Sequence, residues 1–82
     1  MHARKLGKDN APTRAYDVLC AVYPGRISNW ELAQRARTVA VSTVVSEINS
    51  QLPEGEKVEV KRIDGGFYYG LVRNRAVQMA LL

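Results

Sequence analysis

The sequence predicts one small α+β domain, in which three helices are followed by a β-hairpin. Three observations support this prediction: a helix-start signal at Ser28, apolar residues at helical spacing between Val41 and Leu52, and an alternating run from Lys57 to Val72. A length of 82 residues allows a single domain with a modest core. We expect residues 11–73 to form this domain.

The first predicted helix runs from Pro12 or Thr13 to Tyr23, since proline is favoured in a first turn and Pro24-Gly25 stops a helix. It has two apolar faces, one formed by Ala15, Val18, Leu19 and Val22 and the other by Tyr16, Cys20 and Tyr23. A helix that is apolar on most sides is covered by more than one neighbour. The additional cover is expected to come from the C-terminal segment or from a second subunit.

The second predicted helix starts at Ser28, because Ser28 and Glu31 have the spacing of a capping box and Ile27 could form the accompanying hydrophobic staple. Its predicted buried stripe consists of Trp30, Leu32, Ala33 and Ala36. A third helix follows after only Arg37 and Thr38, and Thr38 is a plausible cap. This spacing is typical of a helix-turn-helix.

The third helix is predicted over residues 38–52, with an apolar stripe facing the core and a small, polar outer face. The stripe consists of Val41, Val44, Val45, Ile48 and Leu52, and Val39, Thr43, Ser46 and Ser50 lie opposite. The segment TVAVSTVV is also rich in β-branched residues, which favours a strand. Adjacent Val44 and Val45 break a period of two, so we expect a helix.

The alternating run predicts a hairpin with its turn at Asp64-Gly65-Gly66, residues that tolerate the positive φ of a tight turn. Val58, Val60, Tyr69 and Leu71 are expected on one face, and Ile27 could add a short third strand. The remaining segments are a mobile basic arm (1–10) and an amphipathic segment (74–82). The arm is either a solvated terminus or a contact to DNA. The second segment either folds back over Tyr16, Cys20 and Tyr23 or forms a dimer contact, giving a homodimer through the first helix and residues 76–82.

The composition limits the classes of function that we expect for this chain. The net charge of +4 and the pI near 9.6 favour an acidic partner such as nucleic acid. The single cysteine, Cys20, fits a reducing compartment, and no stretch is long and apolar enough for a membrane span, so a cytoplasmic protein is expected. His2 is the sole histidine, and no nucleophile-elbow, phosphate-loop or metal-ligand pattern is present. We therefore expect neither an enzyme nor a cofactor or metal.

The order helix, short strand, helix, helix, hairpin resembles the winged helix-turn-helix class from Thr13 to Arg73. The segment VVSEI is similar to the recognition-helix core of small helix-turn-helix proteins of phages and prophages. The resemblance implies sequence-specific binding of double-stranded DNA by a transcriptional regulator, with helix 38–52 in the major groove and wing 57–72 on the backbone. The base-facing residues would be Ser42, Thr43, Ser46, Asn49 and Ser50, and the phosphate contacts Arg35, Arg37, Lys61 and Arg62, with Arg4 and Lys5 of the arm.

One difference from that class leaves a second function possible. Recognition helices commonly carry Arg or Lys, because Arg is the commonest specific partner of guanine. Here no cation lies between Thr38 and Leu52, and Glu47 is present. The alternative is a winged helix that binds protein, as an inhibitor or adaptor of a host complex.

Overall fold

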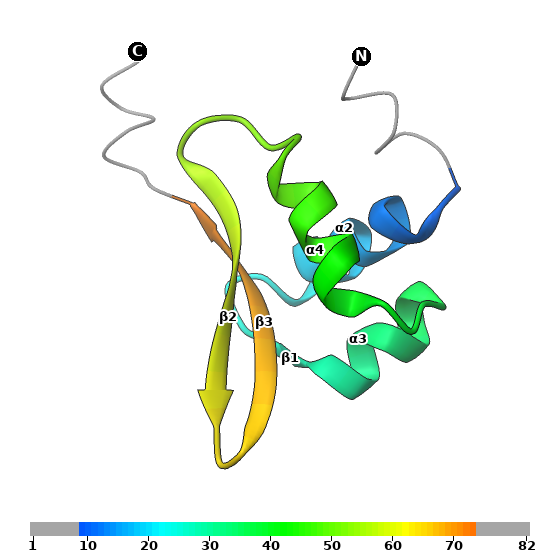
Figure 1. Ribbon diagram of the computed structural model, residues 1–82. Helices are drawn as coiled ribbons and strands as arrows, with labels where there is room; N and C mark the ends of the chain where they lie inside the picture. Colours follow the sequence, from blue (N-terminus) through cyan, green and yellow to red (C-terminus); the bar gives the residue numbers. More distant parts are fainter. Residues whose placement is uncertain (1–8, 74–82) are drawn as a thin grey trace.

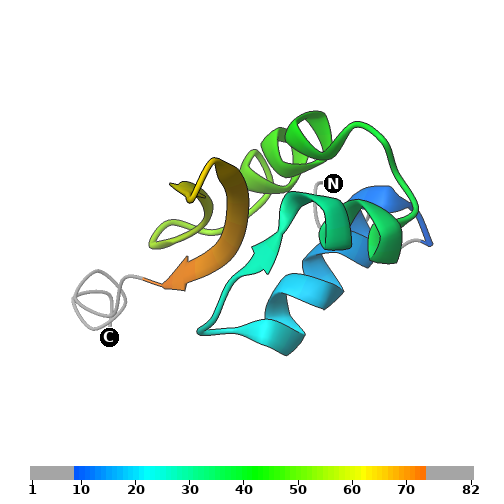
Figure 2. The same ribbon diagram turned by 90° about the horizontal axis from the view of Figure 1, so that it is seen from below.

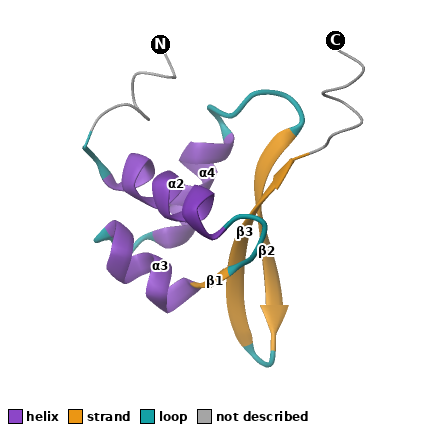
Figure 3. Ribbon diagram, turned by 180° about the vertical axis from the view of Figure 1, so that it is seen from behind, coloured by secondary structure: helices purple, strands orange, loops and turns teal. Residues whose placement is uncertain are grey.

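The computed structural model describes residues 9–73, which form three helices and three strands. In chain order these are α2 (Ala11–Val22), β1 (Ile27–Ser28), α3 (Asn29–Ala36), α4 (Val41–Asn49), β2 (Glu56–Ile63) and β3 (Gly66–Arg73) (Figure 1). The strands form one antiparallel sheet in the order β1-β3-β2, and the helices gather on one side of it (Figures 2 and 3). The α+β prediction is confirmed. Segments 1–8 and 74–82 lie outside the described residues.

Helix α2 begins one residue before the predicted range. The side chain of Asn10 accepts a hydrogen bond from the Thr13 amide at 3.0 Å, which makes Asn10 the N-cap. Pro12 then lies in the first turn, where its missing N–H costs no intrahelical bond. Asn10 therefore belongs to the folded domain rather than to the arm assigned from the sequence.

Helix α3 begins as predicted, since Ser28 Oγ accepts a hydrogen bond from the Glu31 amide at 3.1 Å. It ends at Arg37, a non-glycine residue in the left-handed region with φ of 56°. The Thr38 amide donates to Ala33 O at 3.0 Å, as in a Schellman motif. Arg14 Nε of α2 donates to Ala36 O at 2.9 Å, which satisfies another carbonyl of the last turn.

The predicted position of Trp30 is wrong. The sequence predicts Trp30 in the buried stripe of α3, but 69% of its surface is exposed, whereas Leu32 and Ala36 are fully buried. Trp30 and Leu32 are two residues apart, and at about 100° per residue they point to opposite sides of the helix. Both cannot face one core.

The predicted third helix is confirmed as a helix, but its bounds 38–52 are too long at both ends. Helix α4 spans Val41–Asn49. Thr38 does not cap it: Thr38 Oγ1 accepts from the Ala40 amide at 3.1 Å and so closes the turn before the helix. Ala40 is the N-cap and makes no side-chain capping bond.

The hairpin turn lies within the predicted Asp64-Gly65-Gly66, at Asp64 and Gly65, and Gly66 begins β3. Asp64 and Gly65 both have positive φ, 51° and 82°, as a primed two-residue turn requires. Val58 pairs with Leu71 and Val60 with Tyr69. Ile27 also pairs with Tyr69, which confirms the short third strand.

The core lies between the helices and the inner face of the sheet. Leu19, Leu32 and Ile48, one from each helix, are its largest fully buried side chains. The sheet contributes Ile27, Val58, Tyr69 and Leu71. Within residues 9–73, no helix has the length and apolar character that a membrane span needs.

Candidate nucleic-acid interface

The exposed side of α4 has the composition that the sequence predicts. Ser42, Thr43 and Ser46 are exposed, while the apolar residues of the helix face the core. In the part of the chain that the structure describes, no hydrogen bond engages these three hydroxyl groups. We call Ser42, Thr43 and Ser46 the polar edge of α4.

Asn49 is used inside the fold. The Val58 amide donates to Asn49 Oδ1 at 2.7 Å, and Asn49 Nδ2 donates to Val58 O at 3.1 Å. Strand β2 is an edge strand, so this amide group occupies hydrogen-bonding positions that the sheet leaves open. The predicted bidentate contact of Asn49 to adenine would require both bonds to break.

Ser50 is also engaged, because its hydroxyl donates to Glu47 O at 2.7 Å. A helical wheel places Asn49 and Ser50 on the outer side of the helix but does not reveal these bonds. The groups of the five predicted base-facing residues that stay available are therefore those of the polar edge.

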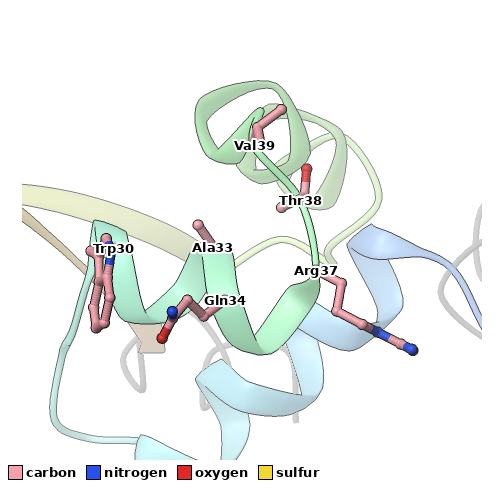
Figure 4. A pocket seen from close by; sticks show the side chains of 6 residues that line it. All are labelled: Trp30, Ala33, Gln34, Arg37, Thr38 and Val39. Carbon is pink, nitrogen blue, oxygen red and sulfur yellow. The ribbon is translucent and has the colours of Figure 1, made fainter.

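A groove of about 420 Å³ separates the first turn of α4 from the hairpin. It is lined by Asn29, Val39, Ala40, Val41, Ser42, Val60, Phe67 and Tyr69. A second hollow lies on the other side of Val39, against α3, and is lined by Trp30, Ala33, Gln34, Arg37, Thr38 and Val39 (Figure 4). Val39 thus forms a ridge between two depressions.

Four exposed apolar side chains line these depressions, and we call Trp30, Val39, Val60 and Phe67 the apolar band. The sequence did not predict the band, because Trp30 is expected in the core and the alternation that places Val60 on one face with Val58 does not say how far the helices cover that face. The helices cover Val58, Tyr69 and Leu71. Phe67 is exposed nearer the turn, and Val60 is exposed on the edge strand β2 although its partner Tyr69 is buried. Strands β2 and β3 have eight residues each, and α3 and α4 have eight and nine, but a helix rises less than half as far per residue as a strand. The length of the strands was therefore the signal that the helices leave one end of the hairpin uncovered.

The predicted phosphate contacts differ in whether their charges are already paired within the fold. Arg35 forms an ion pair with Glu31 at 3.2 Å, and Arg37 lies 3.7 Å from Asp9. Lys61 and Arg62 are exposed on the hairpin, and the Arg62 guanidinium lies over the Phe67 ring at 5.9 Å. Arg4 and Lys5 lie outside the described residues.

The charge of the described domain is balanced. Residues 9–73 contain eight basic and eight acidic side chains, so the net charge of +4 comes from Arg4, Lys5, Lys8 and Arg75. The basic character inferred from the whole sequence is therefore a property of the two terminal segments. Any electrostatic attraction between this chain and an anion depends strongly on them.

A polar cluster on the far side of the domain ties the base of the hairpin to α2. Tyr16 Oη donates to Glu56 Oε1 at 3.1 Å, and Arg73 Nε donates to Glu56 Oε2 at 2.8 Å. The Arg73 guanidinium also lies 4.7 Å over the Tyr23 ring. Burial, then the neighbouring Cys20 thiol and Glu56 carboxylate, raise the pKa of Tyr16 to about 12.

This cluster is structural, since each of its charged groups has a partner within it. Within residues 9–73, no group of three or more His, Cys, Asp or Glu side chains is arranged to hold a metal ion. In comparisons with known proteins, no family model, no curated protein and no solved structure matched this chain.

Proposed function

We propose that this chain is a winged helix-turn-helix protein that binds double-stranded DNA in a sequence-specific manner. Helices α3 and α4 form the helix-turn-helix, α4 enters the major groove, and the β2–β3 hairpin is the wing that follows the backbone. The observation that carries the proposal is the polar edge, whose free hydroxyls lie on the exposed side of a helix beside a hairpin that exposes Lys61 and Arg62. Ser and Thr hydroxyls contact either bases or phosphates.

Affinity and sequence reading are divided between different residues in this proposal. Lys61 and Arg62 contact phosphates, as do Arg4 and Lys5 of the arm, because the described domain alone has no net charge to attract DNA. The polar edge reads bases. A small protein that acts by occupying a DNA site is suited to regulating transcription, and a homodimer through α2 and residues 76–82 would match two half-sites.

The test is a fluorescence-anisotropy titration of the full chain against a mixed-sequence duplex at about 50 mM and about 200 mM salt. We expect the logarithm of the binding constant to fall linearly with the logarithm of the salt concentration. Lys61→Ala and Arg62→Ala should each lower the slope by about 1, since each removes one phosphate contact.

Lys57→Ala is the matched control, because Lys57 lies on the same strand but forms an ion pair with Glu59 at 3.3 Å. It should leave the slope unchanged. Equal slopes for all three variants and the unmodified chain would contradict the proposed wing contact.

The apolar band favours a second candidate function, a winged helix that binds protein. Contiguous exposed apolar side chains are typical of protein-protein interaction sites. This candidate predicts that duplex DNA binds weakly, without sequence preference, and that variants of the polar edge leave this binding unaffected. We place DNA binding first because the polar edge and the exposed Lys61 and Arg62 have no role in the second candidate.

A further inference from the structure

The turn between α3 and α4 holds one apolar side chain entirely in solvent. Val39 is 103% exposed. The residues beside it are fixed by hydrogen bonds, from the Thr38 amide to Ala33 O at 3.0 Å and from the Ala40 amide to Thr38 Oγ1 at 3.1 Å. Val39 is therefore an isopropyl group presented on a rigid turn.

The neighbouring groups continue this pattern. Ala40, just before α4, and Thr43, in the first turn of α4, are both exposed, and each carries a methyl group. No cation lies in α4, and the Asn49 amide is held by Val58. The usual bidentate contacts to guanine and adenine are therefore unavailable to this helix.

Apart from the hydroxyl groups of the polar edge, the side chains that remain for reading bases are small and apolar. In the major groove, the apolar feature that distinguishes one base pair from another is the C5-methyl group of thymine, and side-chain methyl groups are its ordinary partners. The N-terminal residues of a recognition helix are the ones that meet base edges. Val39, Ala40 and Thr43 occupy that end of α4.

We propose that the turn before α4, together with the first turn of that helix, recognises thymine through its C5-methyl group, with Val39 as the principal contact. This inference rests on the proposed DNA-binding function and specifies the bases that it reads. The same methyl group is present at C5 of 5-methylcytosine, so methylated cytosine is accepted in place of thymine and unmethylated cytosine is not.

The experiment compares duplexes of roughly 20 base pairs, about two helical turns. The first pair is alternating dA–dT and the same duplex with deoxyuridine in place of thymidine, which removes the methyl group and keeps every hydrogen-bonding group. The second pair is alternating dC–dG with and without 5-methylcytosine. Affinity is measured at low salt with the full chain.

We expect the methylated member of each pair to bind more tightly, by about four-fold for each methyl group contacted, the factor that corresponds to about 0.8 kcal/mol. Val39→Ala should bring both ratios close to one. Because this comparison uses the same duplexes, any change in DNA stiffness caused by uracil cancels. Trp30→Ala, which removes an exposed apolar side chain on the far side of the ridge, should keep both ratios.

Two other outcomes overturn the inference in different ways. Equal binding to the thymine and uracil duplexes would refute methyl recognition while leaving DNA binding intact. Failure to bind any of the four duplexes at low salt would refute the proposed function, and the inference with it. A protein-binding role for the apolar band would then account for the exposure of Val39.

Discussion

The contact between Asn49 and Val58 makes a quantitative prediction that separates a structural role from a DNA-binding one. Asn49→Ala removes two hydrogen bonds, at 2.7 and 3.1 Å, each of which contributes about 0.5–1.5 kcal/mol net. Alanine has a higher helix propensity than asparagine, by at most about 0.7 kcal/mol, which offsets part of the loss. We therefore expect the free energy of unfolding to fall by about 1–2 kcal/mol.

Urea denaturation monitored by circular dichroism measures this change, and Ser46→Ala is the matched control on the same helix. Ser46 is exposed and its variant should stay within about 0.5 kcal/mol of the unmodified chain. Amide hydrogen exchange adds a local readout, since the Val58 amide should lose protection in Asn49→Ala. Equal stabilities for the two variants, with Val58 still protected, would refute the bridging role. The contact also implies that weaker DNA binding by Asn49→Ala is not evidence of a base contact.

Three further predictions concern the core, the sheet and the tyrosine cluster. Ile48→Ala should lower the free energy of unfolding by about 2–5 kcal/mol, because Ile48 is fully buried, and denaturant titration measures this. Gly70→Ala should also destabilise the fold in such a titration, since a Cβ there would lie 3.0 Å from Gly25 O. The free energy of unfolding should fall as the pH rises from 10 to about 12, because the pKa of Tyr16 is raised in the folded state, which then binds its proton more tightly than the unfolded chain does. Tyr16→Phe should lack that component of the decline, and ultraviolet absorbance should show one tyrosine ionising late.

The features that could be predicted from the sequence are those set by short-range chemistry. The cap at Ser28 depends on residues three positions apart, and the position of the hairpin turn depends on residues that tolerate positive φ between two alternating runs. The phase of α4 followed from adjacent Val44 and Val45, which only a helical period accommodates on one buried side.

The features that could not be predicted depend on contacts between distant segments or on how far one element covers another. Asn49 meets Val58 only because α4 packs beside an edge strand. Trp30 is exposed because the core accepts the opposite side of α3. Helix α4 starts later than predicted, at Val41, because the Thr38 hydroxyl accepts a hydrogen bond within the preceding turn instead of capping the helix. The first of these removes a predicted DNA-contacting group, and the second exposes an apolar surface that the sequence had placed in the core.

DNA reading by α4 can be tested directly by adding duplex DNA to isotope-labelled protein and following the backbone amides by nuclear magnetic resonance. We predict that chemical-shift changes concentrate on the polar edge (Ser42, Thr43 and Ser46), on Val39 and Ala40, and on Lys61 and Arg62 of the hairpin. Residues of α2 on the far side of the domain, such as Asp17 and Ala21, should not respond. Changes confined to residues 1–8, with α4 and the hairpin unaffected, would contradict the claim that this helix reads DNA.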